Sequence, residues 1–152
     1  MIDFEQSPEQ LEMIELARKF GQKHLEPAEI ALDRVNDPQE VIRSELYRKT
    51  MAAAFELGFH KMTIGEQYGG LGLDPMTVGP VWEELAKYGI GFTASLLAGS
   101  VVPGIISFLA PKNKRLVETY SKPFYEPFGQ REVDQLWRWP IDLLVRHGNT
   151  FV

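Results

Sequence analysis

The sequence predicts an all-α fold, a helical bundle, and three observations support this class. A capping residue followed directly by proline occurs at Ser7, Asp37 and Asp74, and this pair is typical of a helix start. Before residue 120, no stretch shows the period-two alternation of a half-buried strand. Residues 90–111 carry no charge, which is typical of the central helix of a bundle.

The first helix is expected to begin after Ser7, with Gln10 placed to complete a capping box. Its predicted buried face comprises Met13, Leu16, Ala17, Phe20 and His24. Residues 25–36 are expected to hold only a short helical turn.

The second helix is expected to begin after Asp37 and to end before Gly58, where a left-handed residue is favoured. Its predicted buried face comprises Ile42, Leu46, Ala53 and Leu57.

A glycine-rich loop at residues 66–74 leads to the third helix. Its glycines lack the spacing of a phosphate-binding loop or of a dinucleotide turn. They are therefore expected to turn the chain at positions that need positive φ. The third helix follows Asp74, and Pro80 within it predicts either a late start or a kink.

Glu83 and Glu84 are adjacent in the third helix. Adjacent helical residues point ~100° apart, so these two carboxylates cannot face one substrate as a catalytic pair. They are expected on a solvated face.

The uncharged segment 90–111 has two interpretations. Its length fits a membrane span, with basic residues directly after it. Four hydroxyl side chains and the pair Pro103–Gly104 interrupt it, however, and the amphipathic helices around it need a central partner. We therefore favour a helix in the core of a water-soluble bundle. On this interpretation Leu97→Asp should unfold the domain.

Composition excludes several kinds of site. The chain has no cysteine, and His24, His60 and His147 lack the spacing of metal ligands. The net charge is −5 with no basic block, so a nucleic acid partner is not expected. The acidic start has no apolar leader segment, which favours the cytoplasm.

Five short segments together resemble the acyl-CoA dehydrogenase family. They are residues 3–11 (DFEQSPEQL), 56–59 (ELGF), 66–74 (EQYGGLGLD), 83–86 (EELA) and 94–97 (ASLL). Their order and spacing agree with the N-terminal helical domain of that family, over residues 1–120. Gly65, where the family commonly has proline, and Pro80 depart from its pattern.

The resemblance implies an FAD-dependent α,β-dehydrogenation of acyl-CoA thioesters. In the family, a glutamate of the C-terminal part removes the α-proton, and FAD, held mainly by other domains, accepts the hydride. The central helix of the N-terminal domain forms one wall of the acyl pocket. Carried onto this sequence, the wall residues are Ala94, Leu97 and Val101; the alternative is that these three are only core. No catalytic or cofactor-binding residue can be carried over.

Residues 121–152 form a tail without family resemblance, in which Trp137 and Trp139 are not in the context of the family's flavin-contacting strand. Alone, the chain is therefore expected to bind no FAD and to be inactive. Two functions fit: part of a dehydrogenase whose other domains lie on another chain, or a free-standing helical interaction module. Self-association is expected in either case, with Trp137, Trp139 and Leu143 either covering the apolar face of the central helix or forming the contact.

Overall fold

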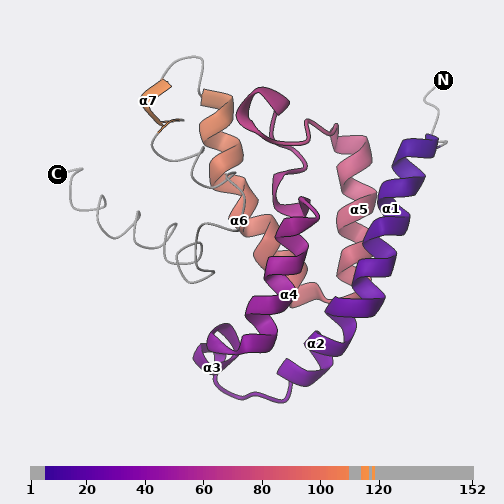
Figure 1. The fold of residues 1–152 in the computed structure, drawn as a ribbon, viewed down its shortest axis with the longest axis vertical. Helices are drawn as coiled ribbons and strands as arrows, with labels where there is room; N and C mark the ends of the chain where they lie inside the picture. The colour runs from indigo at the N-terminus through magenta and orange to yellow at the C-terminus, as the bar shows by residue number, and fades with distance from the viewer. Residues whose placement is uncertain (1–5, 110–113, 117, 119–152) are drawn as a thin grey trace. The chain divides into compact units, whose positions relative to one another are not determined.

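The computed structural model describes residues 6–109, 114–116 and 118. Within these residues every regular element is a helix, which confirms the all-α class (Figure 1). The chain divides into two compact units, one comprising Met1–Met51 with Leu73–Ser95 and the other Ala52–Gly72 with Leu96–Val152. The predicted tail lies outside the described residues.

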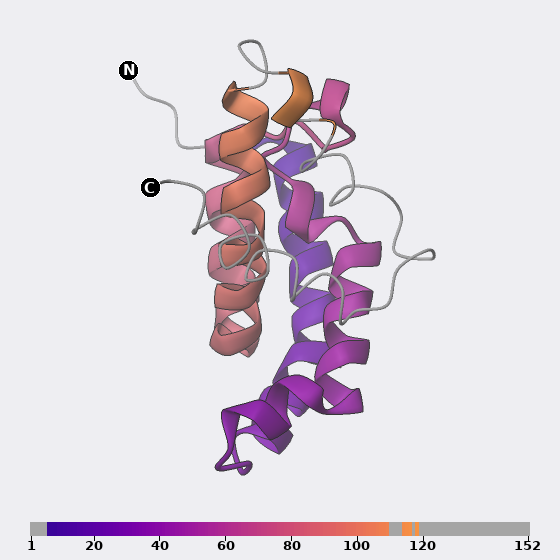
Figure 2. The same ribbon diagram turned by 90° about the vertical axis from the view of Figure 1, so that its left-hand side faces the viewer.

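The first unit begins with α1 (Pro8–Phe20), which passes through a π-helical segment, η1 (Gly21–Leu25), directly into α2 (Glu26–Leu32). Figure 2 shows α1 and α2 following one another as one long rod. The predicted capping box is confirmed: the Gln10 backbone N donates to Ser7 Oγ at 3.2 Å, and the Ser7 N donates to Gln10 Oε1 at 2.9 Å. The prediction of a single turn in residues 25–36 was wrong, because seven of them continue the helix as α2.

The buried face of this rod is only partly the predicted one. Ala17 and Phe20 are buried as expected, but Met13, Leu16 and His24 are only half-buried. The other apolar residues in the core are Ile14, Leu25, Ala28 and Leu32. Contact with α5 (Pro75–Tyr88), which runs beside α1 in Figure 1, helps to set this face. At one such contact a side chain on Gly21 would collide with the Tyr88 ring.

The predicted second helix is two helices, α3 (Pro38–Arg43) and α4 (Glu45–Glu56). Ser44 separates them with an extended ψ of 143°. Its hydroxyl donates to the Val41 carbonyl at 2.8 Å and accepts from the Tyr47 backbone N at 3.1 Å. One serine thus closes α3 and caps α4.

The predicted face of the second helix was wrong. Ile42, Leu46 and Leu57 are 46%, 41% and 38% exposed, and Ala53 is half-buried. The residues of α4 in the core are instead Tyr47, Thr50, Met51, Ala54 and Phe55. Their spacing of three and four residues is as regular as the predicted one, so periodicity alone did not separate the two faces.

Helix α5 begins at Pro75, where Asp74 Oδ1 accepts from the backbone N atoms of Met76 at 2.8 Å and Thr77 at 3.2 Å. The helix includes Pro80, so the alternative of a late start was wrong. The missing N–H of Pro80 removes one backbone hydrogen bond from its first turns.

In the second unit, Gly58 follows α4 with φ 80°, which confirms the predicted left-handed residue. Two short 3-10 turns, η2 (Phe59–Lys61) and η3 (Glu66–Tyr68), follow. Gly69 and Gly72 have the predicted positive φ, at 87° and 61°. Gly70 does not; there a side chain would collide with the Ile64 carbonyl.

Helix α6 (Ile90–Leu109) forms within the uncharged segment 90–111 that was predicted to be helical, and the short α7 (Lys114–Leu116) comes after it in the chain. Among the described residues, no helix has the combined length and apolarity that a membrane crossing requires. Leu96 is 1% exposed whereas Leu97 is 46% exposed. The premise of the Leu97→Asp expectation, that Leu97 is buried, was therefore wrong; the neighbouring Leu96 is the buried leucine.

Candidate functional site

The candidate site is the exposed apolar face of α6. The three predicted wall residues are all exposed: Leu97 is 46% and Val101 is 48% exposed, and the Ala94 side chain is exposed as well. Their spacing of three and four residues places them on one side of the helix. Leu97 and Val101 are therefore not buried as core residues. Their contact with an acyl chain stays a prediction.

Two further residues belong to this face and were missed in the sequence. Ile90 is 65% exposed and Ile105 is 54% exposed, four residues before Ala94 and four after Val101. The same helical spacing could have found both. Together the five residues place apolar side chains along one side of a segment without any charge.

The opposite side of α6 holds the helix in the core. Phe92 and Leu96 are 2% and 1% exposed. The hydroxyls of the polar residues on this side donate to nearby backbone carbonyls: Thr93 Oγ1 to the Gly89 carbonyl and Ser100 Oγ to the Leu97 carbonyl, both at 2.8 Å. The helix is therefore two-sided, although its composition is apolar almost throughout.

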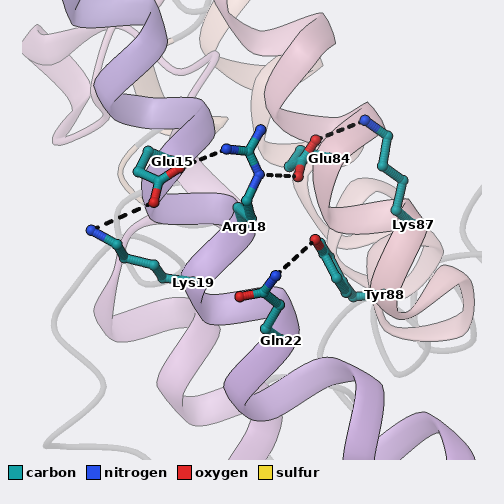
Figure 3. Close-up of polar contacts among 7 residues, drawn as sticks. All are labelled: Glu15, Arg18, Lys19, Gln22, Glu84, Lys87 and Tyr88. Carbon is teal, nitrogen blue, oxygen red and sulfur yellow. Dashed lines mark hydrogen bonds and ion pairs between the residues drawn. The ribbon is translucent and has the colours of Figure 1, made fainter.

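A buried carboxylate is the main polar feature between α1 and α5. Glu84 is 4% exposed; its Oε1 accepts from Arg18 Nε at 2.8 Å and its Oε2 from Lys87 Nζ at 2.7 Å. Arg18 also donates to Glu15 at 2.7 Å, so the guanidinium lies between two carboxylates (Figure 3). The expectation of a solvated face holds for Glu83, which is exposed, and was wrong for Glu84.

The charge of Glu84 is stabilised by these partners. The hydrogen bond from Lys87 lowers the pKa of the Glu84 carboxyl, burial opposes it, and the hydrogen bond and charge of Arg18 add to the lowering. The carboxylate is thus ionised and paired at neutral pH. Through its hydrogen bond with Arg18, the carboxylate joins α5 to α1.

We expect Glu84→Ala to lower the free energy of unfolding by about 1–3 kcal/mol, the usual cost of deleting a buried charge-assisted hydrogen bond. Urea denaturation at neutral pH measures this, with exposed Glu83→Ala as the matched control, expected within about 0.5 kcal/mol of wild type. Equal stabilities of the two variants would contradict a structural role for the buried carboxylate.

His60, in the 3-10 turn η2, is also buried and ionisable. It is 5% exposed and its ring stacks on Phe55 with centroids 4.1 Å apart. Burial, with a smaller contribution from the Lys61 charge, lowers the pKa of His60 to about 3. In the described part of the chain, no three His, Asp or Glu side chains gather as a metal ion would require.

A family model described as acyl-CoA dehydrogenase, N-terminal domain, matches residues 7–116. The match begins at the Ser7 cap, ends in α7, and includes the glycine loop, Glu84 and the exposed face of α6. No curated protein matches the chain, and no solved structure matches it. Because the family model covers well over half of the 152 residues, the chain belongs to the family of acyl-CoA dehydrogenase N-terminal domains.

Proposed function

We propose that this chain supplies the N-terminal helical part of an FAD-dependent oxidoreductase that forms the α,β double bond of acyl-CoA thioesters. We further propose that Ala94, Leu97 and Val101 form one wall of the acyl pocket. The observation that carries this proposal is the outward placement of these apolar side chains on α6, in a chain of this family.

An acyl chain is a chemically suitable partner for this face. Transfer of each methylene from water to an apolar surface contributes about 0.8 kcal/mol. An uncharged wall binds such a chain without demanding a hydrogen bond, and its side-chain volumes set how much chain fits. The size of the side chain at Leu97 is therefore expected to influence the acyl-chain length that the enzyme prefers.

We assign no flavin contact and no catalytic residue to the described residues, and propose that other segments hold the FAD, on this chain or on another. The FAD pyrophosphate needs cationic side chains or free backbone N–H groups. Three such groups here already have partners within the protein: Arg18 and Lys87 pair with Glu84, and Gly91 N donates to Glu29 Oε1.

The test is acyl-chain preference in the flavin-containing enzyme, comparing Leu97→Phe with Leu96→Phe. We expect Leu97→Phe to lower kcat/KM for the longest accepted chain roughly tenfold relative to shorter chains, since one misplaced methylene has effects of this order. Leu96→Phe should instead overpack the core and lower stability, with little change in preference.

Equal shifts in preference for the two variants would contradict the wall assignment. A preparation that is colourless and reduces no dye with acyl-CoA in the presence of the remaining domains would contradict the dehydrogenase proposal as a whole. The cytoplasm remains our proposed location for the protein.

The second candidate is a helical interaction module without flavin chemistry. The exposure of Ile90 and Ile105, which the acyl-pocket wall does not use, supports this candidate. Apolar side chains repeated along one helix face are typical of a surface that self-associates or binds another protein. Sedimentation together with the remaining dehydrogenase domains distinguishes the cases: the dehydrogenase part should form a yellow, flavin-containing complex with them, whereas the module should remain colourless and separate from them.

A further inference from the structure

The start of α6 lacks a capping side chain of its own. Gly89 precedes the helix, and its carbonyl accepts from the Thr93 backbone N at 3.0 Å and from Thr93 Oγ1 at 2.8 Å. Glycine has no side chain that could accept from the first free N–H groups of the helix.

A residue 62 positions away supplies this cap. Glu29, on α2, accepts from the Gly91 backbone N at 3.0 Å through Oε1. Glycine on both sides of Ile90 leaves room for this approach. A Cβ on Gly89 would lie 3.0 Å from Leu25 Cβ and 3.4 Å from Glu29 Oε2, and a Cβ on Gly91 would lie 3.1 Å from Glu29 Oε1. The negative charge also complements the positive end of the helix dipole.

A second contact lies one turn further along the same helix. The Tyr47 ring, from α4, stacks on Phe92 with centroids 5.1 Å apart. Desolvation raises the pKa of the Tyr47 hydroxyl, and a side-chain hydrogen bond with Ser95 opposes this by lowering it. The hydroxyl is therefore neutral at physiological pH.

We infer that Glu29 and Tyr47 are positioning residues that fix the first turns of α6 and so hold Ala94 outward. Phe92 and Thr93, the two residues before Ala94, are only 2% and 5% exposed. Residues differ in direction by ~100° per position, so holding Gly91, Phe92 and Ser95 determines the direction of Ala94. The inference rests on the proposed function only in treating Ala94 as part of the acyl-pocket wall. The contacts that Glu29 and Tyr47 make with α6 do not depend on acyl-CoA.

Thiol labelling tests the inference, because the chain contains no natural cysteine. The single-cysteine variant Ala94→Cys reports on the outer side of the first turns of α6, and Thr93→Cys reports on the inner side. A third variant, Ala17→Cys, at a fully buried position of α1, reports on global unfolding. With Glu29 intact, we expect Cys at 94 to react at least about a hundredfold faster than Cys at 93.

Adding Glu29→Ala should accelerate labelling at 93 about fivefold, the effect expected on loss of a helix cap, without the same acceleration at 17. Glu29→Gln should stay within about twofold of wild type because its amide oxygen can still accept from Gly91. Glu26→Ala, an exposed carboxylate on the same helix, is the matched control and should have no effect.

Equal acceleration of labelling at positions 93 and 17 would show that Glu29 only stabilises the fold as a whole, and would overturn the inference. Unchanged labelling in Glu29→Ala would also overturn it. If Glu29→Ala does not fold, Tyr47→Phe, which keeps the ring and loses the hydroxyl, should accelerate labelling at 93 over 17; no difference would overturn the role of Tyr47. An unaltered acyl-chain preference in Leu97→Phe would contradict the wall and leave these labelling results unaffected.

Discussion

Leu96→Asp is expected to unfold the chain at neutral pH, whereas Leu97→Asp is expected to leave it folded. Leu96 is 1% exposed, and a buried carboxylate without a partner costs several kcal/mol even after its pKa rises. That cost is comparable with the whole stability of a domain, about 5–15 kcal/mol. At Leu97, which is 46% exposed, the new carboxylate remains hydrated. The free energy of unfolding should therefore fall by about 1 kcal/mol or less.

Circular dichroism and urea denaturation of the two variants measure this difference. The pair is well matched, because the same substitution is made at adjacent positions of one helix. A folded Leu96→Asp protein, or equal destabilisation by the two substitutions, would contradict the two-sided character of α6. Partition of the wild-type chain into membranes with a need for detergent would instead favour the membrane interpretation of residues 90–111.

His60 is expected to make the chain less stable as the pH falls below about 6.5. Its pKa is about 3 in the folded state and near 6.5 when unfolded, so between these values the unfolded chain binds a proton that the folded chain does not. Lowering the pH therefore favours unfolding, by about 1.4 kcal/mol per unit. From pH 7.5 to pH 5 the loss should reach about 2 kcal/mol.

Urea denaturation midpoints at pH 7.5 and pH 5 measure this loss, with His60→Leu as the comparison. Between pH 7.5 and pH 5, the free energy of unfolding of His60→Leu should fall by about 2 kcal/mol less than that of wild type. Glu84 acts in the same direction, since its folded pKa lies below the ordinary value of 4.5, but its effect begins at lower pH. Equal losses in the two proteins would show that His60 can take up its proton in the folded state.

The helix starts and the glycine turns could be predicted from the sequence because they depend on neighbouring residues. Ser7, Asp37 and Asp74 accept from backbone N atoms no more than three residues further along the chain, so each cap is complete within a few positions. Positive φ at Gly58 likewise reflects a local steric allowance. Helical spacing placed Ala94, Leu97 and Val101 on one side of α6, but their exposure was not predicted, because the segment was expected to lie in the core.

Which face of α4 is buried, and whether Glu84 is solvated, were decided only by the tertiary structure. Both faces of α4 repeat apolar residues at helical spacing, and only contacts with segments far away in the sequence select Met51 over Leu46. Glu84 lies where α5 packs against α1, and Arg18, 66 residues earlier, comes within 2.8 Å of it. The Glu29 cap on Gly91 spans 62 residues. Such pairings have no local signature, since their free energy depends on distances that exist only once the helices have packed.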